Sequence, residues 1–217
     1  MGAITRAAAN NITTGGVILP AGINDASVAS VTELAQVSAG DGITLISSQT
    51  ASASASISFT TGIDSTYRTY LFKFININPS ADGAEFQFNF STDGGSNYNV
   101  TKTTTSFNAY HDEADTSTNL GYDTGEDLAQ STSFQHIAQP IGSASDESIS
   151  GYMYLFNPSS TTYVKHFISQ ASNYHWQNYS VNHFNAGYGN TTSAINSIRF
   201  QTDTGTFDGA IYLYGIA

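Results

Sequence analysis

Short apolar segments separated by polar turns follow one another from residue 43 to the end of the chain. They are rich in β-branched and aromatic residues, and Gly, Asn, Asp or Pro bounds each of them. No amphipathic helical period is found after residue 43. The pattern therefore predicts an all-β domain over 43–217, an antiparallel β-sandwich of jelly-roll type. The segments that carry this prediction read TYRTYLFKFININ, EFQFNFS, YMYLFN, TYVKHFIS, SIRFQT and AIYLYGI.

Strict alternation of small and hydroxyl residues marks the start of this domain. The stretch ASASASISF over 51–59 alternates with a period of two, which is the period of a strand with one buried face. We therefore expect one continuous strand here. Its buried face would carry Ala51, Ala53, Ala55, Ile57 and Phe59.

A second alternating stretch, EFQFNFSTDGGSNYNV, runs over 85–100. Phe86, Phe88 and Phe90 fall on one face of a strand. Asp93-Gly94-Gly95 follows, and such residues supply the positive φ angles of tight hairpins. The oxygen ligands of a calcium loop and the Gly-Lys-Ser/Thr of a phosphate loop are both lacking. The stretch thus predicts a strand that reverses at the glycines.

The first 42 residues differ from the rest, because they contain no aromatic residue. A segment of this kind cannot build its own core, so 1–42 is predicted to be an extended N-terminal arm that anchors on a partner. One short helix is expected in it, with Asn24 or Asp25 as N-cap and Gly40 as its end. The predicted domains are therefore the arm, 1–42, and the sandwich, 43–217.

Charge restricts the partners of the chain. Six Lys and Arg against 17 Asp and Glu give a net charge of −11. The basic residues are scattered singly, so we expect no nucleic-acid partner. No stretch has the length of a membrane span, so no membrane insertion is expected. The absence of Cys excludes disulfides and thiolate sites. Charged residues make up only 11 %, which favours a surface of Ser, Thr, Asn, Gln and Gly.

Three blocks of sequence resemble structural proteins of tailed bacteriophages. They are YLFKFININPSADGAEFQFNFSTDGGSNYN, SGYMYLFNPSSTTYVKHFISQAS and SAINSIRFQTDTGTFDGAIYLYGIA, which occur in the same order in such chains. Tail-fibre tips, head fibres and decoration proteins share these features. The resemblance implies a virion β-domain, commonly a homotrimer, and implies no catalytic residue.

Acidic residues are densest in HDEAD at 111–115 and YDTGED at 122–127. A polysaccharide depolymerase needs two carboxylates across a cleft, and Asp112, Glu113, Glu126 or Asp127 are the candidates. A metal would draw on the group His111, Asp112, Asp115 and Asp123. Acidic runs most often form solvated loops, so we expect a loop between strands, with no catalytic residue, no metal site and no cofactor.

The segment NYHWQNYSVNHFNAGYGN over 173–190 combines aromatic rings with amides and holds the single Trp of the chain. Sugars stack on aromatic rings while amides bond their hydroxyls. A glycan or receptor contact is therefore one interpretation of this segment. Burial in the sandwich core or in a subunit interface is the other. The candidate contact residues are Tyr174, His175, Trp176, Asn178, Tyr179, Asn182 and His183.

These observations predict a structural protein on the surface of a tailed-phage particle, and not an enzyme. The arm would dock on other virion proteins. The sandwich would project outward as in a fibre, with a host-surface glycan or receptor as its outward partner. A homotrimer is the expected oligomer. The alternatives are a capsid decoration protein that stabilises the shell and a polysaccharide depolymerase.

Overall fold

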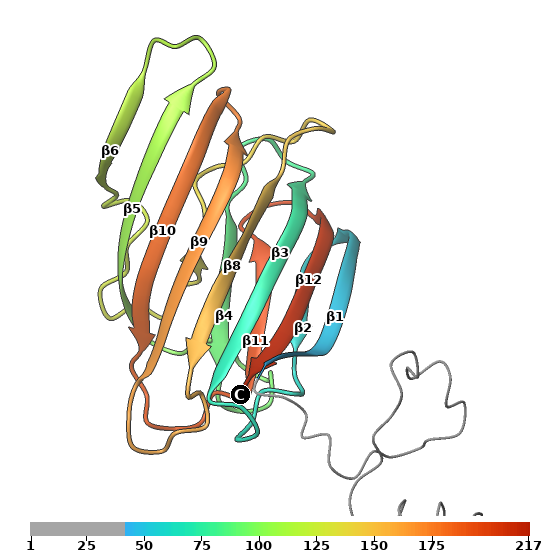
Figure 1. The fold of residues 1–217 in the computed structure, drawn as a ribbon, viewed down its shortest axis with the longest axis vertical. Helices are drawn as coiled ribbons and strands as arrows, with labels where there is room; N and C mark the ends of the chain where they lie inside the picture. The colour runs from blue at the N-terminus through green and yellow to red at the C-terminus, as the bar shows by residue number, and fades with distance from the viewer. Residues whose placement is uncertain (1–41) are drawn as a thin grey trace, which may run out of the picture. The chain divides into compact units, whose positions relative to one another are not determined.

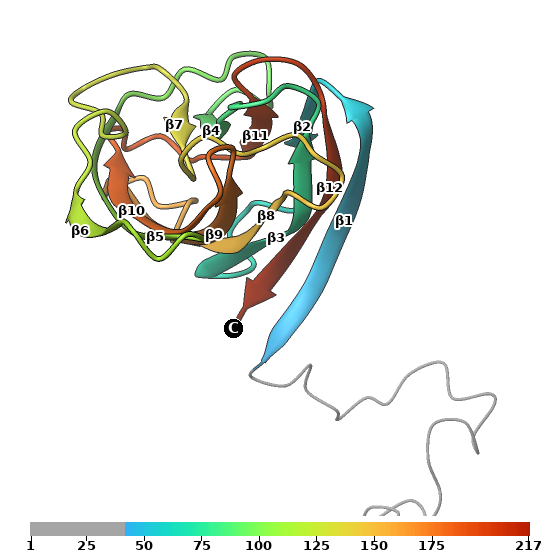
Figure 2. The same cartoon turned by 90° about the horizontal axis from the view of Figure 1, so that it is seen from above.

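Two antiparallel sheets face each other in residues 42–217, which are the residues that this computed structural model describes (Figures 1 and 2). They belong to one compact unit, Asp41–Ala217. The arm and the short helix predicted before residue 42 lie outside the described residues. The all-β prediction is confirmed, since strands and no helices are found over 42–217. The strands are β1 (Ile43–Ser54), β2 (Ser56–Phe59), β3 (Thr69–Pro79), β4 (Phe86–Ser91), β5 (Lys102–Asp112), β6 (Thr118–Tyr122), β7 (Gln135–His136), β8 (Ile149–Phe156), β9 (Lys165–His175), β10 (Tyr179–Gly189), β11 (Ser197–Thr202) and β12 (Phe207–Ile216).

The two sheets differ in size. The large sheet has eight strands in the order β1-β12-β3-β8-β9-β10-β5-β6, and the small sheet has four in the order β2-β11-β4-β7. Figure 2 shows the small sheet on one side, with the large sheet curving around it. This is a β-sandwich with a core between two unequal layers.

Strand pairing follows a nested scheme. The pairs β3–β12, β4–β11, β5–β10 and β8–β9 enclose one another in sequence, as in a jelly roll. The pair β4–β11 lies in the small sheet and the other three lie in the large one. The large sheet is wide because the innermost pair, β8–β9, joins it between β3 and β10.

Phenylalanine rings fill the space between the sheets. Phe200 of β11 lies at the centre, and its ring centroid is 5.2 Å from Phe74 and 5.3 Å from Phe72. Phe86 stacks on it at 5.9 Å. Phe86, Phe88 and Phe90 face this core, as their alternation predicted. Buried aromatic pairs of this kind each contribute about 0.5–1.5 kcal/mol beyond the burial of their area.

The opposite face of β4 is also buried, which the alternation did not predict. The chain that leads into β7 covers it, and Asn89 donates from Nδ2 to the Thr132 carbonyl at 2.9 Å. The Ile137 amide donates to the Phe86 carbonyl at 2.7 Å. Segment 126–137 therefore closes one side of the sandwich.

The continuous strand expected over 51–59 is wrong. The chain passes from β1 in the large sheet to β2 in the small sheet, with a break at Ala55. Ala53 adopts a positive φ of 46°, and the β1–β12 register shifts between Ala51 and Ser54. Ala51, Ile57 and Phe59 are buried as expected, whereas Ala53 and Ala55 are exposed. A bulge with small side chains lets one strand turn a corner between sheets.

The turn after β4 has the predicted backbone but a different role. Gly94 and Gly95 have φ angles of 72° and 89°. Asp93 accepts the Asn97 amide at 2.9 Å and the Ser91 hydroxyl at 2.6 Å. However, β4 and β5 lie in different sheets, so the glycines begin a crossover and not a hairpin.

The two ends of the large sheet carry different features. Ile43 pairs with Ile216 near the C-terminus, at the bottom of Figure 1. The turn between β9 and β10 lies at the opposite end, at the top of that view. The first described residues and the β9–β10 turn are thus separated by the length of the sheet. Within the described residues there is no helix long and apolar enough to cross a membrane.

Candidate functional site

The β9–β10 turn presents most of the predicted contact residues. The Asn178 amide donates to the His175 carbonyl at 2.8 Å, which closes the turn, and Asn178 has a φ of 65°. Asn tolerates this left-handed conformation better than most residues. Trp176 lies at the turn with 45 % of its surface exposed. Trp176 is therefore not part of the sandwich core.

Aromatic rings surround this turn. The Tyr179 ring lies 5.3 Å from the His175 ring and 5.2 Å from the Tyr110 ring of β5. His175 also lies 5.9 Å from Trp176. The Tyr174 hydroxyl donates to Oδ1 of Asn178 at 3.3 Å. We call residues 174–179 the β9–β10 tip; it combines exposed ring surface with amide groups.

A hollow of about 410 Å³ adjoins the tip. Asp112, Glu113 and Ala114 line it on the side of the β5–β6 turn, and Gln177, Asn178 and Tyr179 line it on the side of the tip. The Glu113 amide donates to the Asn178 carbonyl at 3.1 Å, so the two turns are tied together. The neighbouring Glu113 carboxylate raises the pKa of Tyr174. The hollow offers carboxylates, amides and a ring to a polar ligand.

The other two predicted contact residues lie elsewhere. Asn182 accepts from Nε2 of Gln170 at 3.1 Å on the outer face of the large sheet. His183 is fully buried, and its Nε2 lies 2.5 Å from the Ser106 hydroxyl. Burial lowers the pKa of His183, which favours the neutral ring. The expected contact set is therefore divided. Four residues are accessible at the tip, namely Tyr174, Trp176, Asn178 and Tyr179, whereas His175 is buried within it, Asn182 lies on the outer face of the sheet and His183 is interior.

The acidic residues between 111 and 127 have separate structural contacts. Asp112 accepts the Thr116 and Ser117 amides at 2.8 and 2.9 Å, which closes the β5–β6 turn. Asp123 accepts from the side chains of Asn108 and Gln139. The single loop expected here is wrong, because β6 lies inside it and pairs with β5.

Two further contacts complete this account of the acidic segment. His111 and Asp115 form an exposed pair at 3.1 Å. Asp127 accepts the Tyr122 hydroxyl at 2.7 Å. Of the proposed acidic candidates, Glu126 alone belongs to a cluster of titratable groups, and its neighbours are not those that the sequence suggested.

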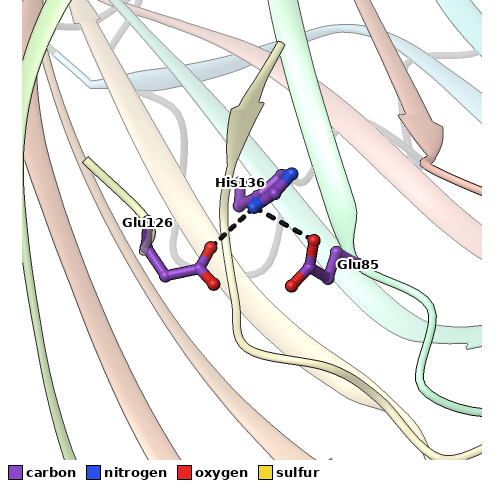
Figure 3. Close-up of side chains that lie close together, drawn as sticks. All are labelled: Glu85, Glu126 and His136. Atoms are coloured by element: carbon purple, nitrogen blue, oxygen red, sulfur yellow. Dashed lines mark hydrogen bonds and ion pairs between the residues drawn. The ribbon is translucent and has the colours of Figure 1, made fainter. Parts of the chain in front are cut away.

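That cluster joins Glu85, Glu126 and His136 (Figure 3). Nδ1 of His136 lies 2.6 Å from Oε2 of Glu126 and 3.2 Å from Oε2 of Glu85. Glu85 directly precedes β4, His136 ends β7, and Glu126 belongs to the segment that covers β4. All three side chains are partly buried. Three separate parts of the chain thus bring one imidazole and two carboxylates together.

Charge in this cluster is unevenly balanced. Burial is the main cause that raises the pKa of Glu85 to about 7; the neighbouring Glu126 and Asp203 carboxylates add to it, and His136 opposes it. Burial lowers the pKa of His136, but the hydrogen bond to Glu126 and the surrounding carboxylates outweigh it, so the net shift is upward. The cluster therefore favours a positive group beside its carboxylates. Neither Glu85 nor His136 stood out in the sequence, because no spacing links them to Glu126.

The outer face of the large sheet is a third surface of interest. Besides Tyr174 of the tip, alternation along β5, β8, β9 and β10 turns seven large apolar side chains away from the core and no Lys, Arg, Asp or Glu. Phe107 is 43 % exposed and Ile168 is 47 % exposed. Phe107 stacks on Phe184 at 4.9 Å. We call this surface the outer aromatic face; its members are Phe107, Tyr152, Tyr154, Phe156, Ile168, Phe184 and Tyr188.

Comparisons with known proteins leave the family open. No family model matches the chain, and neither curated proteins nor solved structures give a match. The sandwich, the β9–β10 tip, the carboxylate–imidazole cluster and the outer aromatic face therefore carry the functional argument, together with the sequence resemblance.

Proposed function

We propose that this chain is a structural protein of a tailed-phage virion, of the fibre type, with the β9–β10 tip as its outward contact. The observation that carries the proposal is the position of the tip. Ile43 pairs with Ile216 at one end of the large sheet, and the β9–β10 turn, to which Trp176 belongs, lies at the other (Figure 1). A chain anchored through residues before Ile43 would present Trp176 away from its anchor.

Chemistry at the tip supports a glycan as the outward ligand. Trp176 has a half-exposed ring, and Asn178 and Gln177 stand beside it with exposed amides. Stacking of a sugar on such a ring contributes on the order of 1 kcal/mol. One site would bind weakly, and several copies on one particle would raise the avidity by roughly 10²–10⁴.

The outer aromatic face supports self-association. Soluble chains rarely expose a wide patch of large apolar side chains unless a partner covers it. The chain carries a net charge of −11, and this face is a part of the surface without carboxylates. A second copy of the chain is therefore a suitable partner. The carboxylates of the two copies would lie outside the interface that these faces form, so they would not repel each other within it. Closed symmetry would cover the face in every copy, and the sequence resemblance favours three copies.

Labelling of virions tests the proposal. Antibody raised against the full chain and detected by electron microscopy of purified particles should mark fibres at the tail or the head. Label spread evenly over the capsid faces would instead favour the decoration protein. If the chain stays in the soluble fraction of the lysate and no particle carries label, the proposal fails.

A further inference from the structure

The cluster of Glu85, Glu126 and His136 has a geometry that the proposed function does not use. Two carboxylate oxygens and one imidazole nitrogen lie within 4.8 Å of one another. The three side chains pair with one another, and separate hydrogen bonds hold their backbones. The Asp203 amide donates to the Glu85 carbonyl at 3.0 Å, and Nε2 of Gln135 donates to the carbonyls of Glu126 and His136 at 2.7 and 2.9 Å.

We propose that Glu85, Glu126 and His136 form a binding site for a divalent transition metal such as Zn²⁺. The ligands would be Nδ1 of His136 and one carboxylate oxygen from each glutamate. Zn²⁺ binds imidazole and carboxylate at about 2.0–2.2 Å, so tetrahedral ligand atoms lie roughly 3.3 Å apart. The contacts to Nδ1 of 2.6 and 3.2 Å are near this spacing. A small outward movement of the side chains would admit the ion.

The ligand set distinguishes among metals. Imidazole nitrogen suits Zn²⁺ and its neighbours in the first transition row, whereas Ca²⁺ and Mg²⁺ prefer oxygen ligands alone. Three protein ligands leave one position for water. A dication would also balance the carboxylates of Glu85 and Glu126, which only His136 balances now.

A metal here would have a structural effect. Glu126 lies in the segment that covers β4, His136 lies in β7, and Glu85 precedes β4. One ion would link these three parts and hold segment 126–137 against the small sheet. Metal bound only by the folded chain stabilises it, because unfolding separates the ligands.

The test uses the full chain, stripped with EDTA and titrated with ZnCl₂ by calorimetry and by thermal melting. We expect one site per chain and a rise in Tm of about 5–10 °C at a hundredfold excess over Kd. Glu126→Gln and His136→Gln should each weaken binding by at least tenfold and so reduce the rise to about half or less at the same ZnCl₂ concentration. CaCl₂ should leave Tm unchanged.

A matched control separates this site from surface histidines. His111→Gln removes an exposed His–Asp pair and should leave both stoichiometry and Tm rise as in the parent. Glu85→Gln serves as a second site variant if His136→Gln does not fold. Since the ion-paired cluster also stabilises the chain without metal, only the zinc-dependent rise counts. Zinc binding that persists in all site variants, or a Tm rise with Ca²⁺ instead of Zn²⁺, would overturn the proposal.

Discussion

Single residues contribute unequally to this fold, and Phe200 has the most central position. Its ring packs against Phe59, Phe72, Phe74 and Phe86 between the two sheets. Phe200→Ala leaves a cavity bounded by rigid rings that cannot collapse into it. We expect a loss of about 3–5 kcal/mol in the free energy of unfolding, measured with urea.

A peripheral ring provides the control for that variant. Tyr163 is 69 % exposed in the β8–β9 loop, so Tyr163→Ala should change the stability by less than about 0.5 kcal/mol. Similar losses in the two variants would contradict the assignment of Phe200 to the centre of the core.

Lys102 makes stability depend on pH. Its Nζ is buried and donates to Oδ1 of Asn89 at 2.5 Å and to the Val100 carbonyl at 2.9 Å, with no carboxylate among these partners. Burial lowers its pKa from 10.5 to about 7. Between these values the unfolded chain holds a proton that the folded chain has lost. Stability should therefore rise from pH 7 to pH 9, by up to about 1.4 kcal/mol per pH unit.

Substitution of Lys102 tests whether this residue causes the pH dependence of stability. Lys102→Met should flatten the dependence between pH 7 and 9, whereas Lys73→Met, at an exposed position on β3, should keep it. Urea unfolding at three pH values measures both. An unchanged slope in Lys102→Met would show that another group produces it.

At the scale of elements, the crossover after β4 depends on its glycines. A Cβ at Gly95 would lie 2.7 Å from the Tyr98 hydroxyl and 2.9 Å from Cγ2 of Thr60, whereas one at Gly94 meets nothing within 4 Å. Both glycines have positive φ. Gly94→Ala should cost about 1–2 kcal/mol for its backbone alone, and Gly95→Ala should cost more. Equal losses of unfolding free energy in Gly94→Ala and Gly95→Ala, measured with urea, would contradict the close contacts expected for a Cβ at Gly95.

The β9–β10 tip is the element in which core and contact interpretations differ most. Trp176 is half exposed, so Trp176→Ala should lower the stability by less than about 1 kcal/mol. It should sharply reduce adsorption to host cells if the tip contacts a glycan. Tyr163→Ala, an exposed aromatic at the other end of the sheet, should keep adsorption. Normal adsorption by Trp176→Ala would remove the tip from the proposal.

The sequence predicted the strands better than the connections between them. Alternation placed Phe86, Phe88 and Phe90 together on one face, toward the core, because residues two apart lie on the same face of a strand. It did not show that the opposite face of β4 is buried as well. It failed at 51–59, where Ala53 adopts a positive φ and the strand changes sheets. Small side chains allow a strand to pass from one sheet to the other, but their presence in a sequence does not predict that it will.

The candidate site residues also depend on connections that the sequence pattern does not show. His183 and Trp176 are indistinguishable in an aromatic segment, yet one is interior and the other exposed, because the turn at Asn178 separates them. Glu85, Glu126 and His136 meet only through the folding of segment 126–137 over β4. No local pattern carries that information.

The outer aromatic face predicts self-association of the whole chain. Ile168→Lys places a charge among the outward-facing rings of β5, β8 and β10 and should convert an oligomer to a monomer. Tyr163→Lys adds the same charge outside this face and should have no effect. Light scattering after size-exclusion chromatography measures both masses. A parent chain that is monomeric at micromolar concentration would contradict the prediction.

If the chain is anchored on a particle as proposed, the β9–β10 tip points away from the particle and the end that holds Ile43 points toward it. The chain contains no Cys, so one introduced thiol is a unique label. Gln177 is exposed in the tip, and Thr161 is exposed in the β8–β9 loop at the other end. We therefore choose maleimide labelling of intact virions that carry Gln177→Cys or Thr161→Cys. We expect Gln177→Cys to react as fast as in the free protein and Thr161→Cys to react more slowly until the particle is disrupted. Faster labelling of Thr161→Cys than of Gln177→Cys on intact virions would contradict it.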